Sequence, residues 1–391
     1  MQTCSLTLWT GFQGSCGGTK VLPAGNSGKH AILSQDAILS CVHSLLPPGA
    51  YRTHMKLSSS KEDSILAKIA SSARLSSKKA PTQASLPLGI GDDAALFQPR
   101  TGYETVLTCD WVLEGIHFLR DKHPPDSVGW KCLARALSDV AAMGGVPRCC
   151  LLSLALPTTL TGRWLDSFLG GLRRASRKFQ CILAGGDTTR RDQILINVTV
   201  VGEILKGRAL LRSGARPGDF LYVSGHLGEA ECGLQLLQRS KGRHDPKAPL
   251  LRKHLYPEPR LALGQWLAAT RFATAMMDLS DGLSTDLPRL CDASGVGARL
   301  LASQIPAVQI PTQNRKGGDD PLQFALHGGD DYELLFTIPP LHKTRVPRSY
   351  HGLPLTQIGI MTSERRLVLV DENGRERSLL PCGWDPFRPN R

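Results

Sequence analysis

Aspartates beside glycine, or at the ends of apolar runs, recur in five separate segments of this 391-residue chain. Such positions are where strands and helices end, so the carboxylates should gather at the edges of secondary structure. Mg²⁺ prefers carboxylate oxygens and usually takes one or two of them beside the phosphates it binds. The pattern therefore indicates several metal ions held against a polyphosphate. The segments are GIGDDAAL (89–96), LTCDWVLEGIHF (107–118), ALSDVAAMGG (136–145), AGGDTTR (184–190) and MDLSDGLSTDL (277–287).

The composition leaves room for a soluble enzyme of two domains. The hydrophobic content is 41%, which is ordinary for a soluble protein, and no apolar run has the length of a membrane span. The eleven cysteines include no CxxC pair. They are interpreted as small apolar fillers in a reducing compartment, so we expect a cytoplasmic protein without disulfides, structural zinc or a membrane partner.

The formal net charge is +13, which would favour binding to nucleic acid, to an acidic membrane or to small anionic substrates. The basic residues are dispersed, without a long Lys/Arg block or interleaved aromatic residues, so we expect no nucleic-acid partner. A positive surface around a phosphate-binding cleft would attract ATP and a phosphorylated substrate. Any single lysine could instead be an ordinary solvated surface charge without a role in binding.

The chain divides into three expected parts. Residues 1–61 are poor in acidic residues and show no period that would build a core, so they should form a disordered extension, unless the natural start is Met55. Residues 62–205 should form an N-terminal domain that binds ATP and Mg²⁺. Residues 206–391 should form a C-terminal α/β domain, because the turn-rich segment RSGARPGD (212–219) resembles a hinge.

Strand and helix patterns alternate along the chain, as in an α/β or α+β enzyme. A helix is predicted at 127–143, with Asp139 beside its apolar stripe, and Asp187 is expected in a turn between two strands. Strands are predicted at residues 88–90, 94–97, 105–108, 149–156, 181–184, 194–201, 220–223 and 273–277.

Taken in order, the motifs resemble the thiamine-monophosphate kinase family. That family belongs to the ATP-binding superfamily of the aminoimidazole ribonucleotide synthetases. The resemblance covers the chain from about Asp63 to Phe387, and rests on the five aspartate segments together with GRALLRSGARPGD (207–219), GGDDYEL (328–334) and CGWDPF (382–387). It implies a two-domain fold of the aminoimidazole ribonucleotide synthetase type, whose N-terminal mixed sheet pairs across a homodimer.

The resemblance also implies roles for individual residues. Mg²⁺ is expected to be held by six aspartates, with two further residues flanking one of the sites. The aspartates are Asp93, Asp110, Asp139, Asp187, Asp278 and Asp281, and the flanking residues are Thr108 and Cys109. The nucleotide is expected at Gly186, Asp187, Arg212 and Ser280, and thiamine phosphate at His117, Asp330 and Trp384. The family usually has Glu in place of Asp330 and Ser or Thr in place of Cys109.

The implied reaction is ATP-dependent phosphorylation of thiamine monophosphate to thiamine diphosphate, the last step in making that cofactor. No covalent nucleophile or general base is expected, because the acceptor phosphate is already mostly dianionic at neutral pH. His117 is therefore predicted to contact the substrate. The alternative is a histidine of the protein core whose hydrogen bonds are all made within the protein. Two other functions stay open: a synthetase of the same superfamily that activates an amide or formyl oxygen, and a non-catalytic nucleotide-binding protein.

Overall fold

A computed structural model of the chain describes residues 61–77, 85–239, 248–310, 317 and 319–388. Almost all of the expected N-terminal extension lies outside the described residues. The chain from Leu57 onward clusters into one unit by its internal contacts, and the following description concerns that unit.

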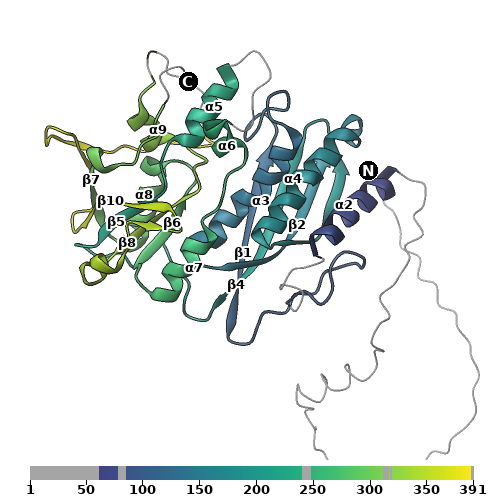
Figure 1. The fold of residues 1–391 in the computed structure, drawn as a ribbon, viewed down its shortest axis with the longest axis horizontal. Helices are drawn as coiled ribbons and strands as arrows, with labels where there is room; N and C mark the ends of the chain where they lie inside the picture. Colours follow the sequence, from purple (N-terminus) through teal and green to yellow (C-terminus); the bar gives the residue numbers. More distant parts are fainter. Residues whose placement is uncertain (1–60, 78–84, 240–247, 311–316, 318, 389–391) are drawn as a thin grey trace, which may run out of the picture. The chain divides into compact units, whose positions relative to one another are not determined.

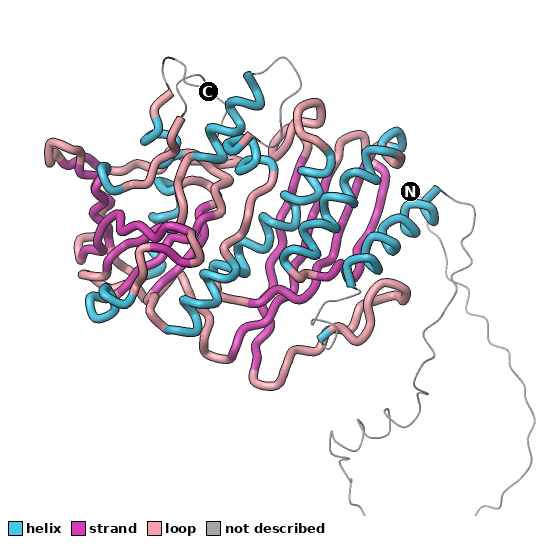
Figure 2. Tube along the Cα trace, in the orientation of Figure 1, coloured by secondary structure: helices cyan, strands magenta, loops and turns pink. Residues whose placement is uncertain are grey.

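A four-stranded sheet organises the first part of this unit. Its order is β1-β4-β2-β3, with β2 and β3 parallel and the other neighbours antiparallel. The parallel pair is joined by helix α4, as a parallel connection requires. Helices α2, α3 and α4 lie in one layer over the sheet (Figures 1 and 2). The elements are α2 (Lys61–Ser77), β1 (Tyr103–Leu113), α3 (Pro125–Ala142), β2 (Val146–Leu156), η2 (Thr158–Leu160), α4 (Arg163–Phe179), β3 (Ile182–Arg190) and β4 (Leu195–Leu205).

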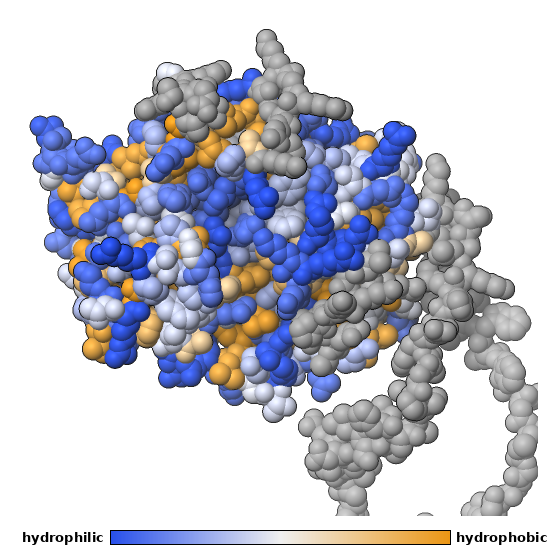
Figure 3. Space-filling model, in the orientation of Figure 1, coloured by the Kyte–Doolittle hydropathy of each residue, from blue (hydrophilic) through white to orange (hydrophobic). Residues whose placement is uncertain are grey.

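Strand β1 shows why this sheet has two different faces. Val106 and Val112 are buried in the core shared with α3 and α4. Their neighbours Leu107 and Trp111, which point the other way, are 67% and 53% exposed. The face on which α2, α3 and α4 lie, which is turned to the viewer in Figure 3, shows hydrophilic areas interspersed with apolar ones. Among the described elements, none covers the opposite face of the sheet, on which Leu107 and Trp111 are exposed.

A second sheet organises the rest of the chain. Its strand order is β12-β11-β7-β10-β5-β8-β6, with β9 paired to β10, and only β11 and β7 are parallel among these described strands. Its strands are β5 (Phe220–Ser224), β6 (Ala275–Leu279), β7 (Gly297–Leu301), β8 (Glu333–Ile338), β9 (Ser349–Tyr350), β10 (Leu353–Thr362), β11 (Leu367–Val370) and β12 (Glu376–Ser378). Its helices are α5 (Glu229–Arg239), α6 (Pro249–Leu255), α7 (Leu261–Thr270), α8 (Leu283–Ser294), η3 (Ala302–Gln304), α9 (Pro321–His327) and η5 (Pro340–Arg345).

Helix α3 connects the two sheets, since it also packs against α7 and β6. The α3–α7 contact is close because glycine stands at the crossing. A Cβ atom built on Gly264 would lie 2.0 Å from the Ala141 carbonyl oxygen. A shared apolar cluster joins Ala141 on α3 to Leu267 on α7 and Phe336 on β8. The position of α3 relative to the second sheet is thus fixed by packing.

We expect Gly264→Ala to lower the free energy of unfolding by about 2 kcal/mol or more, because the added methyl group must push the two helices apart. Gly170→Ala is the matched control, since Gly170 lies in α4 with open space around its Cβ position. That change should be neutral or stabilising by up to about 1 kcal/mol, because alanine is the better helix former. Chemical denaturation measures both. Equal stabilities of the two variants would contradict the close packing.

The predicted α/β class is confirmed, and most predicted elements are present. Two short strands expected at 88–90 and 94–97 were wrong: those residues form only isolated bridges, such as Leu88 with Leu96. The turn expected around Asp187 was also wrong, because β3 continues to Arg190 and pairs with β2 along its whole length. The glycines and threonines there have a neighbouring strand to bond with, which the local sequence does not reveal.

Candidate active site

A cavity of about 250 Å³ lies where the two sheets meet α3. Its lining includes all three residues predicted to contact the substrate, His117, Asp330 and Trp384. Ser280 and Asp281, from the turn between β6 and α8, line it as well. These residues are far apart in sequence, and the fold brings them to one place. The cavity is the candidate active site.

One stripe of helix α3 runs beside this site and contributes Arg135 to the cavity wall. Lys131, Arg135 and Asp139 are spaced four residues apart, so they share a face of the helix. Each has a partner from another element. Lys131 Nζ lies 2.7 Å from Asp330 Oδ2, Arg135 Nε donates to Asp110 Oδ1 at 3.2 Å, and Asp139 accepts a short hydrogen bond from the Thr108 hydroxyl. The stripe thereby fixes three site residues relative to one another.

Asp330 occupies a strained and fully engaged position. Its φ of +66° is left-handed, a conformation that non-glycine residues seldom adopt. One carboxylate oxygen faces Lys131, and the other accepts a hydrogen bond from Tyr332 Oη at 2.6 Å. Burial would raise the pKa of Asp330, but Lys131 and other nearby positive groups hold it well below its usual value. Asp330 is thus ionised, and both of its oxygens have partners inside the protein.

Three carboxylates stand close enough to oppose one another's ionisation. The pKa of Asp139 is raised to about 6, first by burial and then by Asp278. The pKa of Asp278 is also raised to about 6, first by burial, with further contributions from Asp286 and then Asp110. The pKa of Asp110 is raised by burial, although Arg135 opposes the shift. This group of negative charges favours a bound cation.

The turn after β6 is shaped by a carboxylate that the sequence analysis did not single out. Asp286 is fully buried, and its Oδ2 accepts hydrogen bonds from the backbone N–H groups of Ser280 and Asp281, both at 2.9 Å. Arg289 donates to Asp281 and to Asp286, at 2.7 Å in each case. Asp286 therefore orients the residues expected to meet ATP and metal.

The carboxylates of this site fit an Mg²⁺ ion that binds together with the substrate phosphates. Among the described residues, no group of three or more His, Cys, Asp or Glu side chains is arranged to hold an ion by itself. Mg²⁺ bound beside substrate phosphates needs only one or two protein carboxylates and keeps several waters. Asp110, Asp139 and Asp278 provide oxygen ligands of the preferred kind, and burial together with neighbouring carboxylates raises the pKa of each.

His117 is positioned as a neutral side chain. Its Nδ1 accepts a hydrogen bond from the Leu113 N–H at 3.0 Å. Its pKa is lowered to about 4, first by burial and then by Arg135. Arg212, which was predicted to contact ATP, is exposed on the loop before β5, yet its charge lowers the pKa of Asp139. Arg212 therefore belongs to the acidic side of the site.

Two predicted metal residues are not brought to this group in the described structure. Cys109 lies between Thr108 and Asp110 on β1, and strand alternation turns its side chain to the opposite, exposed face of the sheet. The prediction that its side chain flanks the metal is not supported by this orientation. Asp93 is exposed in the loop before β1, where its backbone N–H bonds to the neighbouring Asp92.

Gly186 and Asp187 also lie apart from the acidic group. They are on β3, an edge strand separated from β1 by β4 and β2. Three strand spacings correspond to about 14 Å. Position 186 requires glycine, because its φ is +152° and a Cβ there would lie 1.9 Å from the Leu152 carbonyl oxygen. The backbone at this position is therefore bare, as a close approach to a ligand would need.

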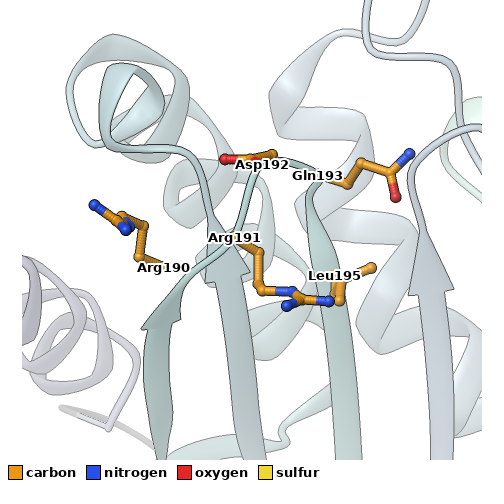
Figure 4. Close-up of a pocket in the computed structure, with 5 residues that line it drawn as sticks. All are labelled: Arg190, Arg191, Asp192, Gln193 and Leu195. Carbon is orange, nitrogen blue, oxygen red and sulfur yellow. The ribbon is translucent and has the colours of Figure 1, made fainter.

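A larger cavity, of about 580 Å³, lies at the connection between β3 and β4. It is lined by Arg190, Arg191, Asp192, Gln193 and Leu195, and contains no residue predicted for the site. In the close-up of Figure 4, the arginine and glutamine side chains point in different directions and do not converge on one centre. This cavity is not assigned a role.

Sequence reasoning missed Lys131, Arg135 and Asp286, as well as His254, a buried histidine in the cavity wall. A signal existed for the first two, because charged residues repeat every four positions with Asp139 in a helix that is otherwise apolar. Asp286 was visible as a carboxylate inside the apolar pattern of the following helix. Nothing in the local sequence marks His254.

The family models of AIR synthase related proteins match most of this part of the chain. The N-terminal domain model matches residues 91–204, and the C-terminal domain model matches residues 216–375.

Curated and solved relatives agree with these matches. A thiamine-monophosphate kinase of Aquifex aeolicus is 37% identical over 300 residues, covering 76% of this chain and 92% of the relative. The crystal structure of a thiamine-monophosphate kinase from Stenotrophomonas maltophilia is 35% identical, with a TM-score of 0.69, and covers 80% of this chain and 96% of its own.

A further solved structure contains ligands. The structure of AaThiL complexed with AMPPCP and TMP is 36% identical, has a TM-score of 0.66, and covers 76% of this chain and 92% of its own. The resemblance drawn from the motifs is thus confirmed, as is the expected two-part fold. The chain belongs to the thiamine-monophosphate kinase family of AIR synthase related proteins.

Proposed function

We propose that this chain is an enzyme that transfers the γ-phosphoryl group of ATP to the phosphate of thiamine monophosphate, giving thiamine diphosphate and ADP. Family membership supports the reaction, because curated relatives are thiamine-monophosphate kinases and one was solved with AMPPCP and TMP. The structural observation that carries the proposal is the cavity in which His117, Asp330 and Trp384 meet Ser280 and Asp281. The expected acceptor and donor residues share one site.

We assign Mg²⁺ first to Asp110, Asp139 and Asp278, the three carboxylates that raise one another's pKa. Thr108 and Asp281 remain proposed ligands beside them, and Asp93 and Asp187 are proposed by resemblance alone. When bound, the ions would neutralise phosphate charge and help to align the two substrates. Arg212 is proposed to add planar donors to the ATP phosphates, and Gly186 to present bare backbone to the nucleotide.

The protein's own contribution is positioning. A phosphate oxygen of thiamine monophosphate attacks the γ-phosphorus of ATP, the bond to the β-phosphate bridging oxygen breaks, and ADP leaves. The acceptor phosphate is mostly dianionic at neutral pH, so no group of the enzyme must remove a proton. The lowered pKa of His117 is consistent with a neutral substrate contact. Because Lys131 and Tyr332 engage Asp330, its expected contact with the substrate is proposed to use its remaining lone pairs.

The reaction is tested by incubating the full chain with ATP, Mg²⁺ and thiamine monophosphate, and then separating thiamine species by chromatography. We expect thiamine diphosphate and ADP in equal amounts, with thiamine itself a poor acceptor. Consumption of ATP only in the presence of a purine-pathway amide would favour the synthetase alternative instead. Binding of ATP without turnover of any acceptor would favour a non-catalytic protein.

We further propose a homodimer built on the uncovered face of the four-stranded sheet. Leu107, Trp111 and Leu151 are 67%, 53% and 37% exposed on this face. The register places Val201 beside Leu107 and Thr199 between Cys109 and Leu151, so these side chains lie at neighbouring positions on one face. A second copy of the same sheet would bury this face, as the family resemblance implies.

The dimer is tested by light scattering during size-exclusion chromatography. At micromolar concentration we expect a mass near twice the 42.4 kDa of the chain. Leu107→Asp should shift the mass toward the monomer, because it places charge in the apolar contact. Leu341→Asp is the control, since Leu341 is also highly exposed, at 78%, but lies outside this sheet. A monomeric parent chain would contradict the proposal.

We also propose a domain boundary and a cellular location. The boundary between the domains is placed near residue 205, since separate apolar cores lie on either side of it. A cytoplasmic location is proposed because all described cysteines are free thiols, including Cys150 and Cys181, which contact each other. In the described part of the chain, no helix has both the length and the apolar character needed to cross a bilayer.

A further inference from the structure

Helix α5 (Figure 1) contributes an acidic side chain to the cavity wall that the assignments above do not use. Glu231 lines the cavity together with Ala230 and Leu234 of the same helix. Its side chain is only partly buried. The other carboxylates of the cavity, Asp281 and Asp330, already have expected roles toward metal and substrate. Glu231 therefore needs an explanation of its own.

A series of hydrogen bonds along α5 holds the Glu231 carboxylate in place. Residues 231, 235 and 239 are spaced four apart, so they share one face of the helix. Arg239 donates to both carboxylate oxygens of Asp319, at 2.8 and 3.0 Å, and also to the Gln235 side-chain oxygen. Because that oxygen faces Arg239, the amide nitrogen of Gln235 faces Glu231 and donates to Oε1 at 2.9 Å. One oxygen of Glu231 is thereby fixed.

The second carboxylate oxygen of Glu231 remains available to a ligand. Within the part of the chain that the structure describes, Oε2 has no hydrogen-bond or ion-pair partner. This oxygen is also not among the polar atoms that are sealed away from solvent without a partner. A molecule that enters the cavity can therefore reach it.

Glu231 carries the unbalanced charge of this wall. Among the described residues, the other charged groups of the cavity form ion pairs of 2.7 to 3.2 Å: Arg135 with Asp110, Asp281 with Arg289, and Asp330 with Lys131. The cavity histidines supply no positive charge at neutral pH, because burial is the first cause that lowers the pKa of each: His117, His254 and His327. A positively charged ligand would restore the balance at Glu231.

The rest of the wall favours a flat, apolar ligand. Ile116 and Trp384 line the cavity and are 53% and 44% exposed, and Leu234 adds further apolar surface. The face of an indole ring attracts a cation, and a nearby carboxylate attracts it as well. An ATP phosphate would instead be repelled by Glu231. The chemistry of this wall thus suits an aromatic ring that carries a positive charge.

We propose that Glu231 is a specificity-determining residue that neutralises the positive thiazolium ring of thiamine monophosphate. The proposal rests on the proposed function, since it names a contact with that substrate. The thiazolium charge is permanent, so the contact does not require a proton. The site would therefore bind a neutral ring compound of the same shape without the benefit of Glu231.

The first test compares thiamine monophosphate with its 3-deaza analogue, in which a neutral thiophene replaces the thiazolium. We expect Glu231→Gln to raise the KM for thiamine monophosphate roughly five- to tenfold, as for a partly buried ion pair, with kcat little changed. The KM for the neutral analogue should change less than about twofold. Comparing the parent chain with the variant cancels the different hydration of the two compounds. An equal effect on both compounds, or no effect on either, would overturn the proposal.

The choice of variant separates this contact from a structural role. Glu231→Gln keeps a side-chain oxygen for the amide of Gln235, so the helix should be retained. Glu372→Gln is the matched control, because it changes the net charge equally but lies exposed between β11 and β12, outside the cavity. It should leave both KM values unchanged. If Glu372→Gln raised the KM for thiamine monophosphate as much as Glu231→Gln, the overall charge of the protein would explain the effect and the contact would be refuted.

The second test does not depend on turnover. Isothermal titration calorimetry of the full chain, with Mg²⁺ and AMPPCP present, measures the affinities for thiamine monophosphate and the neutral analogue. We expect Glu231→Gln to lose the same five- to tenfold in affinity for thiamine monophosphate alone. Unchanged affinity would overturn the proposal. A parent chain that binds as expected but forms no thiamine diphosphate would instead refute the proposed reaction, and one that binds no thiamine monophosphate would refute both.

Discussion

Asp139→Asn is expected to lower kcat by roughly 10²- to 10³-fold, a loss typical of removing one electrostatic contact to a transition state. Asp139 is held by Thr108 and stands beside Asp278 in the acidic group assigned to Mg²⁺. The amide has the same shape but no charge, so the fold should be retained while metal and phosphate are bound less well. Initial rates at saturating ATP and Mg²⁺ measure the effect.

Asp292→Asn is the matched control for this change. Asp292 is exposed near the end of α8, outside the cavity. The control variant should keep the parent rate, and both variants should unfold at the parent temperature. A near-normal rate for Asp139→Asn would mean that this carboxylate has only a structural role, and the assignment of the acidic group to metal would then be wrong.

Lys131→Met is expected to lower the free energy of unfolding by about 3–5 kcal/mol at neutral pH, as for other buried pairs that lose one partner. The Lys131 side chain is 3% exposed and that of Asp330 is 24% exposed, so water can replace the lost ammonium group only in part. The variant leaves Asp330 ionised and only half satisfied. Equilibrium denaturation measures the loss.

The pH dependence of this loss gives a second check. In the parent chain the pKa of Asp330 is lower in the folded state than in the unfolded state, so its contribution is present above the unfolded pKa. That contribution is lost only as the pH falls through the lower, folded pKa. Without Lys131, burial raises the pKa of Asp330, and protonation at acidic pH relieves the unpaired charge. The stability difference should therefore narrow as the pH is lowered.

Lys178→Met provides the control, because Lys178 pairs with Glu258 at the surface, where both side chains are more than a third exposed. This change should cost less than about 1 kcal/mol and should show little dependence on pH between neutral and mildly acidic conditions. If Lys131→Met lowered the free energy of unfolding no more than this control, the buried pair would not be what holds Asp330 in place.

The family and the general fold could be predicted from sequence because the aspartate motifs are local and occur in a fixed order. The details of the site depend on contacts that local patterns do not contain. Lys131 meets Asp330 across 199 residues, and no helical period at 131 predicts which carboxylate lies opposite. The His123–His254 pair similarly joins a loop to a short helix. Such pairs become visible only in three dimensions.

At two positions the structure differs from the local sequence pattern for a simple physical reason. Cys109 was grouped with Thr108 and Asp110 by its place in a motif, although successive residues of a strand point to opposite faces. Asp187 was placed in a turn because glycine and threonine surround it, although pairing with β2 extends the strand through that segment. In both cases the tertiary pairing of strands, which is non-local, determined the outcome.

The most direct test of the account follows γ-labelled phosphate in a single turnover. The full chain is incubated with labelled ATP and Mg²⁺, with and without thiamine monophosphate, and then denatured. If the transfer is direct, label should appear in thiamine diphosphate only when the acceptor is present, and the protein should carry none in either sample. Stoichiometric label on the protein that passes to thiamine diphosphate on adding the acceptor would contradict direct transfer, and no labelled thiamine diphosphate at all would contradict the proposed reaction.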